Sequence, residues 1–273
     1  LILIFDAYDR DYNQPKIEIT QSEENGRINK SAKQPPESTI INETKLGTVN
    51  PAQKEISSLE NKKLLINFDA KSGELLFSKL KDYPIKLGAM DNVVILDYDK
   101  KRYTASSNLQ IKDEQSIPIF SVVEKSDDSV KLSSTNLTNI TLTKKITLVE
   151  DSHQLLVSNN IFNNSNENVY VRNYEIISRD NNSSASLMLP TYTGSAYYDS
   201  ENKFSKISFD DMLENEQAIR VQDSWISMIE HYFFSAWLPT DSELRTVYTN
   251  HENGVFTIGR TSQYSIVEPG QNY

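Results

Sequence analysis

The side chains that could carry catalysis are few and widely separated in this chain. It has three histidines, His153, His231 and His251, and none has a partner at the spacing of H-x-H or H-E-x-x-H. It has no cysteine, which excludes a thiol nucleophile and a disulfide. Around Gly194-Ser195 there is no G-x-S-x-G elbow for a nucleophilic serine. We therefore expect no catalytic residue, no metal site and no bound cofactor.

Carboxylates are plentiful, because the chain has 38 Asp and Glu residues. Sugar hydrolysis needs two carboxylates at a set separation across a cleft, and adjacency in sequence does not establish that geometry. Glu230 and His231 are neighbours, but adjacent helical residues do not face the same way. We expect this pair on a polar face, solvated or capping a helix. Other adjacent carboxylates are Asp127-Asp128, Glu150-Asp151 and Asp210-Asp211.

The charge distribution argues against nucleic-acid binding. The net charge is −10 and there is no basic block, whereas phosphate binding requires clustered Lys and Arg.

Short strands are the elements that must position any site. Leu64, Ile66 and Phe68 recur at every second position, which puts them on one face of a strand, before a turn at 71–73. Further runs rich in Val, Ile, Thr and aromatics are separated by polar turns, and Asn253-Gly254 predicts a hairpin. Many short strands at near-regular spacing predict an antiparallel sandwich.

The run DSWISMIEHYFFSAWLP, residues 223–239, holds both tryptophans of the chain. Its apolar residues recur at i, i+3, i+4, i+7 and i+8, which predicts a helix over about 225–233, capped by Asp223 or Ser224. The end of the run, FFSAWLP over 233–239, is equally compatible with a strand. The run contains Asp223, Glu230 and His231 and is too short and too polar to span a bilayer. Trp237 is expected in the core, and Trp225, nearer the polar entry turn, is expected to contribute less.

The first sixty residues differ from the rest of the chain in composition. Residues 1–5 are apolar and suggest the outer end of a truncated N-terminal transmembrane helix over 1–12. Residues 13–60 are polar, interrupted by proline and free of aromatics, so they cannot bury enough apolar area to order themselves. We expect a flexible tether over 13–60 and a strand-rich domain over 61–273.

Two stretches of this domain resemble the first periplasmic domain of the YidC-type membrane protein insertases of Gram-negative bacteria. The family reads as a Gly-Ala-x-Tyr hairpin, a Lys-x-Lys-Phe/Tyr-x-Phe-Asp strand, and then Gly-Trp-x-x-Met-x-x-x-Tyr-Phe-x-x-Ala-Trp-Ile/Leu-Pro. The first two motifs are matched by Gly194, Ala196, Tyr197, Lys203, Lys206, Phe209 and Asp210. The third is matched by Trp225, Met228, Tyr232, Phe233, Ala236, Trp237, Leu238 and Pro239.

The resemblance implies a β-supersandwich similar to galactose mutarotases, mainly β, with antiparallel sheets and one or two short helices. It implies a non-enzymatic domain in the periplasm, tethered to the inner membrane by the N-terminal helix and by a missing C-terminal membrane domain. The implied partners are Sec accessory subunits of the SecD/SecF type and nascent membrane proteins. The matched motif residues are then structural, and no insertase residue transfers, because the membrane portion is absent.

The same fold similarity leaves a second hypothesis open, a carbohydrate-binding or mutarotase-like module. A third is a purely structural spacer. Where the family has a glycine pair before the first tryptophan, this chain has Asp223-Ser224, so its entry turn can differ.

Overall fold

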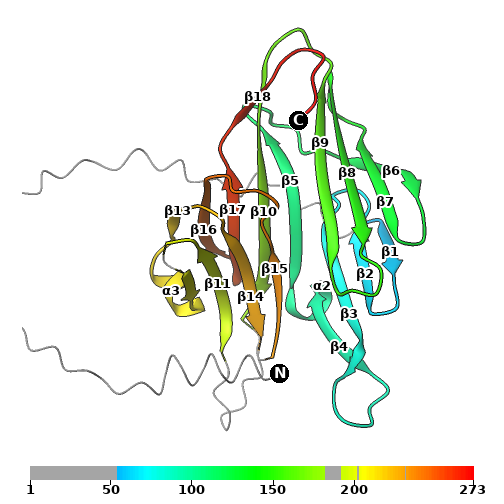
Figure 1. Ribbon diagram of the computed structural model, residues 1–273, viewed down its shortest axis with the longest axis vertical. Helices are drawn as coiled ribbons and strands as arrows, with labels where there is room; N and C mark the ends of the chain where they lie inside the picture. The colour runs from blue at the N-terminus through cyan, green and yellow to red at the C-terminus, as the bar shows by residue number, and fades with distance from the viewer. Residues whose placement is uncertain (1–53, 182–191, 202, 231) are drawn as a thin grey trace, which may run out of the picture. The chain divides into compact units, whose positions relative to one another are not determined.

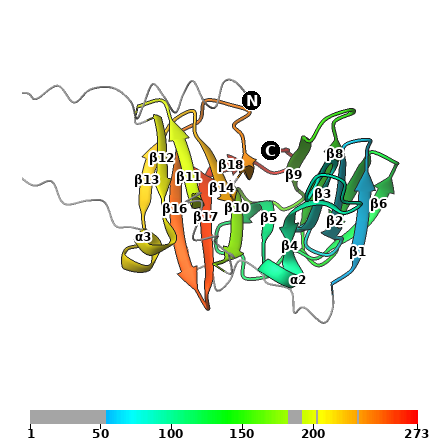
Figure 2. The ribbon, with the colours of Figure 1, turned by 90° about the horizontal axis from the view of Figure 1, so that it is seen from below.

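The part of the chain that the structure describes forms one large antiparallel sheet and two smaller sheets that lie against it (Figure 1). The computed structural model describes residues 54–181, 192–201, 203–230 and 232–273. Figure 2 shows the two smaller sheets at opposite ends of the large one. The mainly β, antiparallel architecture expected from the sequence is confirmed.

The large sheet has the order β1-β2-β3-β5-β10-β17-β16-β13, with β4 added beside β3 and β18 beside β10. Its strands are β1 (Ile56–Glu60), β2 (Leu64–Asp69), β3 (Leu75–Pro84), β4 (Asn92–Asp97), β5 (Thr104–Ile111), β10 (Val169–Asp180), β13 (Ala218–Val221), β16 (Arg245–Glu252), β17 (Val255–Ser262) and β18 (Ser265–Val267).

The two smaller sheets each have four strands. One has the order β6-β7-β8-β9, formed by β6 (Phe120–Lys125), β7 (Ser129–Ser134), β8 (Ile140–Leu148) and β9 (Leu155–Asn163). The other has the order β12-β11-β14-β15 and packs on β10 and β17; it is formed by β11 (Thr193–Asp199), β12 (Lys203–Ile207), β14 (Trp225–Glu230) and β15 (Phe233–Trp237).

Two short helices occur in the described ranges. Helix α2 (Tyr98–Lys101) begins at Asp97, whose carboxylate accepts the N–H of Lys100. Helix α3 (Phe209–Glu214) begins at Ser208 with a reciprocal capping box to Asp211. No helix in the described ranges has the length and apolar character needed to cross a bilayer.

The strand predictions made from local signals are confirmed. Leu64, Ile66 and Phe68 are all buried on β2. The β16–β17 hairpin turns at Asn253 and Gly254, whose φ angles of 51° and 74° suit a two-residue hairpin loop.

The helix predicted over about 225–233 is wrong, because β14 and β15 occupy that run. β14 lies between β11 and β15, and Ile226, Ser227 and Met228 are all buried. Both faces of β14 carry apolar side chains, Ile226 and Met228 on the inner face and Trp225 and Ile229 on the outer. The alternation that identifies a strand is therefore missing, and the apolar residues match a helical period by chance. Asp223 has a φ of 52° and lies in the bend that leads into β14. The strand alternative for the end of the run is confirmed by β15.

The strand-rich part begins slightly before the expected boundary at residue 61. β1 starts at Ile56, inside the segment 13–60 that the composition predicts to be a tether. The rest of that segment up to residue 53, and the predicted transmembrane end over 1–12, lie outside the described residues.

Lys144 on β8 is an exception within the core. Only 1% of it is exposed. Its Nζ donates to the Ser72 carbonyl at 3.2 Å and lies 5.4 Å from the ring centre of Phe120. Gly73 has a φ of 70°, a conformation that other residues rarely adopt, and a Cβ there would lie 2.6 Å from this Nζ. Burial lowers the pKa of Lys144 to about 7, and the charge of Glu74 acts in the opposite direction.

Replacing Lys144 by methionine should change how stability depends on pH. The amine has a pKa of about 7 in the folded chain and an ordinary pKa of 10.5, so between these values the unfolded state binds more protons. The wild-type free energy of unfolding therefore rises with pH, by about 1 kcal/mol per pH unit from this group. For Lys144→Met, the free energy of unfolding should lack this rise with pH. Urea melts at several pH values between about 7 and 9 measure the difference from the wild type. The exposed neighbour Lys145→Met is the control, and equal slopes in all three proteins would contradict the prediction.

Candidate functional site

The run 223–239 folds into the β14–β15 hairpin, which lies on the large sheet (Figure 1). Cross-strand partners share a face. Ile226 with Trp237 and Met228 with Ser235 therefore form its inner face, toward β10 and β17. The hairpin is attached to that sheet by buried polar side chains at its base, middle and far end.

Arg260 of β17 holds the base of the hairpin. Its guanidinium donates to the carbonyl of Ser224, just before β14, and to that of Leu238, just after β15, at 2.9 Å for the latter. Its Nε donates to Glu175 of β10 at 3.0 Å, and Arg245 Nη1 lies 3.6 Å from the same carboxylate. Burial lowers the pKa of Arg260, and Glu175 opposes that shift. Both ends of the hairpin thus converge on one buried cation.

Glu230 holds the far end of the hairpin. It accepts hydrogen bonds from Lys101 Nζ at 2.7 and 3.0 Å and from Arg179 Nη1 at 3.2 Å. The Arg179 side chain is 0% exposed and that of Glu230 is 20% exposed. The guanidinium of Arg179 also lies over the Tyr103 ring, 5.1 Å from its centre. A buried cation is tolerated when it is paired, and Glu230 supplies the charge.

Tyr103 and Trp237 make three further hydrogen bonds that hold the hairpin. The Tyr103 hydroxyl donates to the Met228 carbonyl at 3.1 Å and lies 2.7 Å from Ser235 Oγ. Burial raises the pKa of Tyr103 to about 12, so the phenol stays protonated at neutral pH. The indole N–H of Trp237 donates to the Ile176 carbonyl at 3.0 Å.

The structure corrects the sequence expectation for Glu230. Its carboxylate is not a solvated or capping group, because it faces Arg179 and Lys101 between the sheets. These partners are 51 and 129 residues away, so local sequence carried no signal of them. His231 lies outside the described residues.

The other candidate groups are not brought together into a catalytic arrangement. His153 lies in the β8–β9 turn against Tyr83, and His251 lies in β16 against Phe256. Within the described ranges no group of three or more acidic or histidine side chains could hold a metal ion. The three adjacent acidic pairs lie in the β6–β7 turn, the β8–β9 turn and α3, and are largely exposed.

Most matched motif residues pack inside the domain. Tyr197, Phe209 and Met228 are buried, and Phe233, Trp237 and Pro239 are partly buried. Trp237 is thus less buried than expected. Trp225 is also partly buried, and its ring stacks on Tyr198 with centres 5.9 Å apart.

Two motif residues have more particular roles. Gly194 lies under the ring of Tyr192, and a Cβ there would be 2.6 Å from the Tyr192 hydroxyl. That hydroxyl donates to the Ser195 and Ile207 carbonyls, so the glycine lets Tyr192 join β11 to β12. Tyr232 is 80% exposed, which distinguishes it from the packing residues.

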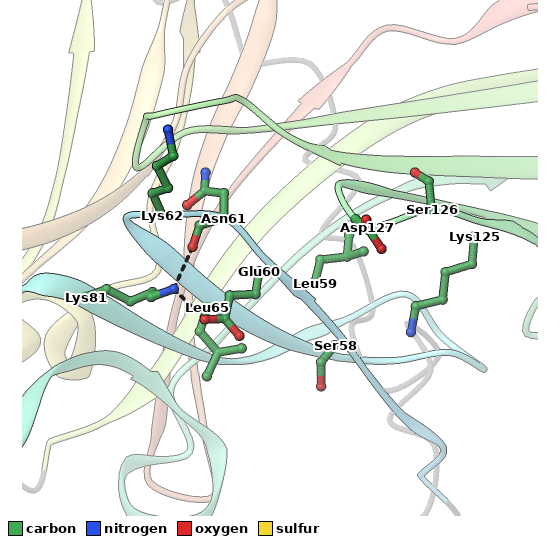
Figure 3. A pocket seen from close by; sticks show the side chains of 10 residues that line it. All are labelled: Ser58, Leu59, Glu60, Asn61, Lys62, Leu65, Lys81, Lys125, Ser126 and Asp127. Atoms are coloured by element: carbon green, nitrogen blue, oxygen red, sulfur yellow. Dashed lines mark hydrogen bonds and ion pairs between the residues drawn. The ribbon is translucent and has the colours of Figure 1, made fainter.

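A groove of about 670 Å³ lies between the end of β1 and the β6–β7 turn (Figure 3). Its two carboxylates are Glu60, which is ion-paired with Lys81, and Asp127. Lys81 also donates to the Asn61 carbonyl at 2.8 Å. The residues that line the groove include one glutamate, Glu60, but no histidine, so the groove does not hold the pair of histidine and glutamate that a mutarotase-like reaction needs.

With this geometry established, the comparisons with known proteins assign the family. A family model described as the YidC periplasmic domain matches residues 57–273.

The chain belongs to the YidC periplasmic domain family.

Proteins named membrane protein insertase YidC are similar over almost the whole chain. The one from Haemophilus ducreyi is 28% identical over 98% of this chain and 51% of its own length. The one from Mannheimia succiniciproducens is 28% identical over 94% of this chain and 49% of its own length. The chain thus spans about half the length of these relatives.

A solved structure supports the fold class. The galactose mutarotase related enzyme from Lactobacillus acidophilus has a TM-score of 0.50 and 8% identity, over 80% of this chain and 94% of that one. The galactose mutarotase-like architecture implied by the resemblance is therefore confirmed as a fold. At this identity the likeness carries no activity.

Replacing Glu230 by glutamine should destabilise the domain by about 3 kcal/mol, the lower end for breaking a buried pair. The change keeps the shape of the side chain but removes the negative charge beside Arg179, which is 0% exposed. Urea melts of Glu230→Gln beside the exposed control Glu214→Gln measure the difference. A loss no larger than that of the control would show that Arg179 does not depend on Glu230.

Replacing Trp237 by alanine should cost about 3 kcal/mol, the lower end for truncating a large aromatic, because the indole is only partly buried. Trp237→Phe keeps most of the packing but leaves the Ile176 carbonyl without the indole N–H, so it should cost about 1 kcal/mol. Trp225→Ala should cost less than Trp237→Ala, because its ring packs on the outer face against Tyr198 and Phe204. The three free energies of unfolding test the order, and equal losses for both tryptophans would refute it.

Proposed function

We propose that this chain is the periplasmic domain of an inner-membrane protein insertase and acts by contacting partners while membrane proteins insert and fold. The observation that carries the proposal is the family match over residues 57–273, together with relatives named membrane protein insertases. The proposed partners are nascent membrane proteins and accessory subunits of the Sec translocon, of the SecD/SecF type.

The proposal assigns no reaction to the domain. The residues that form the β14–β15 attachment are paired with one another: Arg260 with Glu175, and Arg179 with Glu230. Charged groups committed to each other in this way hold a hairpin in place and are not free to exchange protons with a substrate. In this proposal the matched motif residues serve the fold.

The proposal also places the domain at the inner membrane, on its periplasmic side. The segments that would tether it there are the predicted helix end over 1–12, the polar stretch that follows it, and a membrane portion corresponding to the unmatched half of the relatives. A domain held in this way stays near the membrane surface while its orientation adapts to partners.

Binding measurements with the full chain test this function. Purified periplasmic domains of SecD and SecF, an in vitro translated membrane protein and a panel of monosaccharides are titrated against it. We expect saturable binding to at least one of the protein partners and none to the sugars. Binding to a sugar alone would favour the carbohydrate-binding alternative, and binding to none of them would favour a structural spacer.

A further inference from the structure

Tyrosines and basic side chains gather on one face of the large sheet, at the end where β18 lies beside β10 (Figure 1). The end of β5, the start of β10 and β18 with the residues on either side of them supply this group. We call it the tyrosine–arginine face. Its members are Gln110, Lys112, Tyr170, Arg172, Tyr264 and Ile266.

The strand register places these side chains on a common face. Ile266 is the cross-strand partner of Tyr170, and Gln110 is that of Arg172. Cross-strand partners share a face, and so do Tyr170 and Arg172, because they are two residues apart on β10. Val171 between them is 0% exposed and lies in the core. The tyrosine–arginine face therefore points away from the core.

Direct contacts join the other two members to this face. The guanidinium of Arg172 lies over the ring of Tyr264, 4.7 Å from its centre. The backbone N–H of Lys112 donates to the Tyr170 carbonyl at 2.9 Å, and its Nζ lies 5.5 Å from the centre of the Tyr170 ring. Two cation–π pairs thus lie side by side on the same three strands, and the face is continuous.

The tyrosines and the isoleucine are open to solvent. Ile266 is 56% exposed, Tyr170 is 42% exposed and Tyr264 is 39% exposed. Tyrosine and arginine are the residue types that are enriched at the centres of protein interfaces, where they carry most of the binding energy. Tyrosine also offers a large contact area at a low cost in conformational entropy. The composition of the face therefore indicates a surface that binds protein.

Both cations of the face are without an ion-pair partner in the part of the chain that the structure describes. Arg172 Nε donates at 2.7 Å to Gln110, whose side chain is neutral, and Lys112 is exposed. Arg179 and Arg260, by contrast, are each paired with a glutamate. The face thus presents two positive charges to solvent in a chain whose net charge is −10.

The guanidinium of Arg172 is held ready for a carboxylate. Its contacts with Gln110 and Tyr264 fix its position, and none of the described residues accepts a hydrogen bond from its Nη atoms. The fork of a guanidinium matches the two oxygens of a carboxylate, and a side chain that is already ordered loses little entropy on binding. Asp113 and Glu114 in the adjoining turn do not pair with it, and Glu114 accepts the N–H of Ser116.

The charge of the face argues against three other occupants. A second copy of the chain in a symmetric dimer would bring the same patch against itself and place like charges together. An anionic bilayer recruits clusters of about four to eight Lys and Arg residues, and this face has only Lys112 and Arg172. Nucleic acid requires a basic surface of similar extent, which leaves an acidic protein segment as the occupant that the face fits.

We propose that the tyrosine–arginine face binds an acidic segment of a partner protein. Carboxylates of the partner pair with Arg172 and Lys112, and the rest of the segment packs on Tyr170, Tyr264 and Ile266. This inference rests on the proposed function and specifies both the surface and the chemistry of its partner contact.

Peptide binding to the full chain tests the assignment. The probe is a short labelled peptide of aspartate, tyrosine and serine, and the same peptide with asparagine in place of aspartate is the neutral probe. Affinities are measured by fluorescence anisotropy for the wild type, Arg172→Glu and Lys112→Glu. The matched control is Arg220→Glu, which reverses the charge of an exposed arginine on β13, at the edge of the same sheet.

We expect Arg172→Glu and Lys112→Glu each to weaken binding of the acidic peptide by at least about tenfold, and Arg220→Glu to bind it like the wild type. All three changes alter the net charge equally, so the comparison isolates the local contact. Binding of the acidic peptide should also weaken as salt is added, and the neutral peptide should bind less tightly. Because Lys112 is exposed, its variant keeps the test decisive if Arg172→Glu fails to fold.

Several results would overturn the assignment. They are a wild type that does not bind the acidic peptide, a Lys112→Glu variant that binds it equally well, and an equal loss in Arg220→Glu, which would show an effect of net charge alone. Co-sedimentation with phosphatidylglycerol vesicles that Lys112→Glu abolishes would show a membrane contact instead. A concentration-dependent dimer that Lys112→Glu abolishes would show self-association instead.

The same variants separate this inference from the proposed function. If the wild type and Lys112→Glu bind the purified Sec accessory domains and the translated membrane protein equally well, the inference about the face fails and the proposed function stands. If the wild type binds none of these proteins, the proposed function fails. The acidic peptide then decides by itself whether the face binds carboxylates.

Discussion

The placement of the β14–β15 hairpin depends on Arg260. This one buried side chain contacts the chain just before β14 and just after β15, and its charge is balanced by Glu175 on β10. An ion moved out of water costs several kcal/mol unless its charge and its hydrogen-bond donors are matched. The carboxylate matches the charge, and two backbone carbonyls of the hairpin take up donors. The base of the hairpin therefore lowers the cost of burying Arg260, and Arg260 in turn holds the hairpin in place.

At the far end of the hairpin, the buried cation of Arg179 is likewise paired with a carboxylate, that of Glu230. Between the two charged contacts, Tyr103 and Trp237 add neutral hydrogen bonds to backbone carbonyls. Polar networks of this kind favour one arrangement, because a shifted hairpin would take these acceptors away from buried donors. The result is a hairpin with a fixed inner face whose exposed aromatic residues, Tyr232 and Phe234, stand on a rigid base.

The sequence predicts the local elements better than the contacts between them. The alternation of Leu64, Ile66 and Phe68 and the Asn253-Gly254 turn depend on neighbouring residues, and both predictions are confirmed. The run 225–237 misled because both faces of β14 carry apolar side chains, so the alternation of an ordinary amphipathic strand is missing. Glu230 and Lys144 read as surface residues in a chain that is 24% charged. Their burial depends on partners far along the chain, Arg179 for one and Ser72 for the other. Leu87 and Met90 show the opposite case, because two apolar residue types that are usually buried are fully exposed here.

The contacts of Arg260 also bear on how this part of the chain can change in evolution. The guanidinium of Arg260 donates to the carbonyls of both Ser224 and Leu238. The number of residues between these two positions is therefore constrained, as well as which residues they are. A single inserted residue within β14 or β15 would shift the side-chain alternation and turn an inner-face residue outward. Length variation is therefore best tolerated where the hairpin reverses, beyond Glu230. There it would alter the reach of the exposed end while the attachment to the large sheet stays the same.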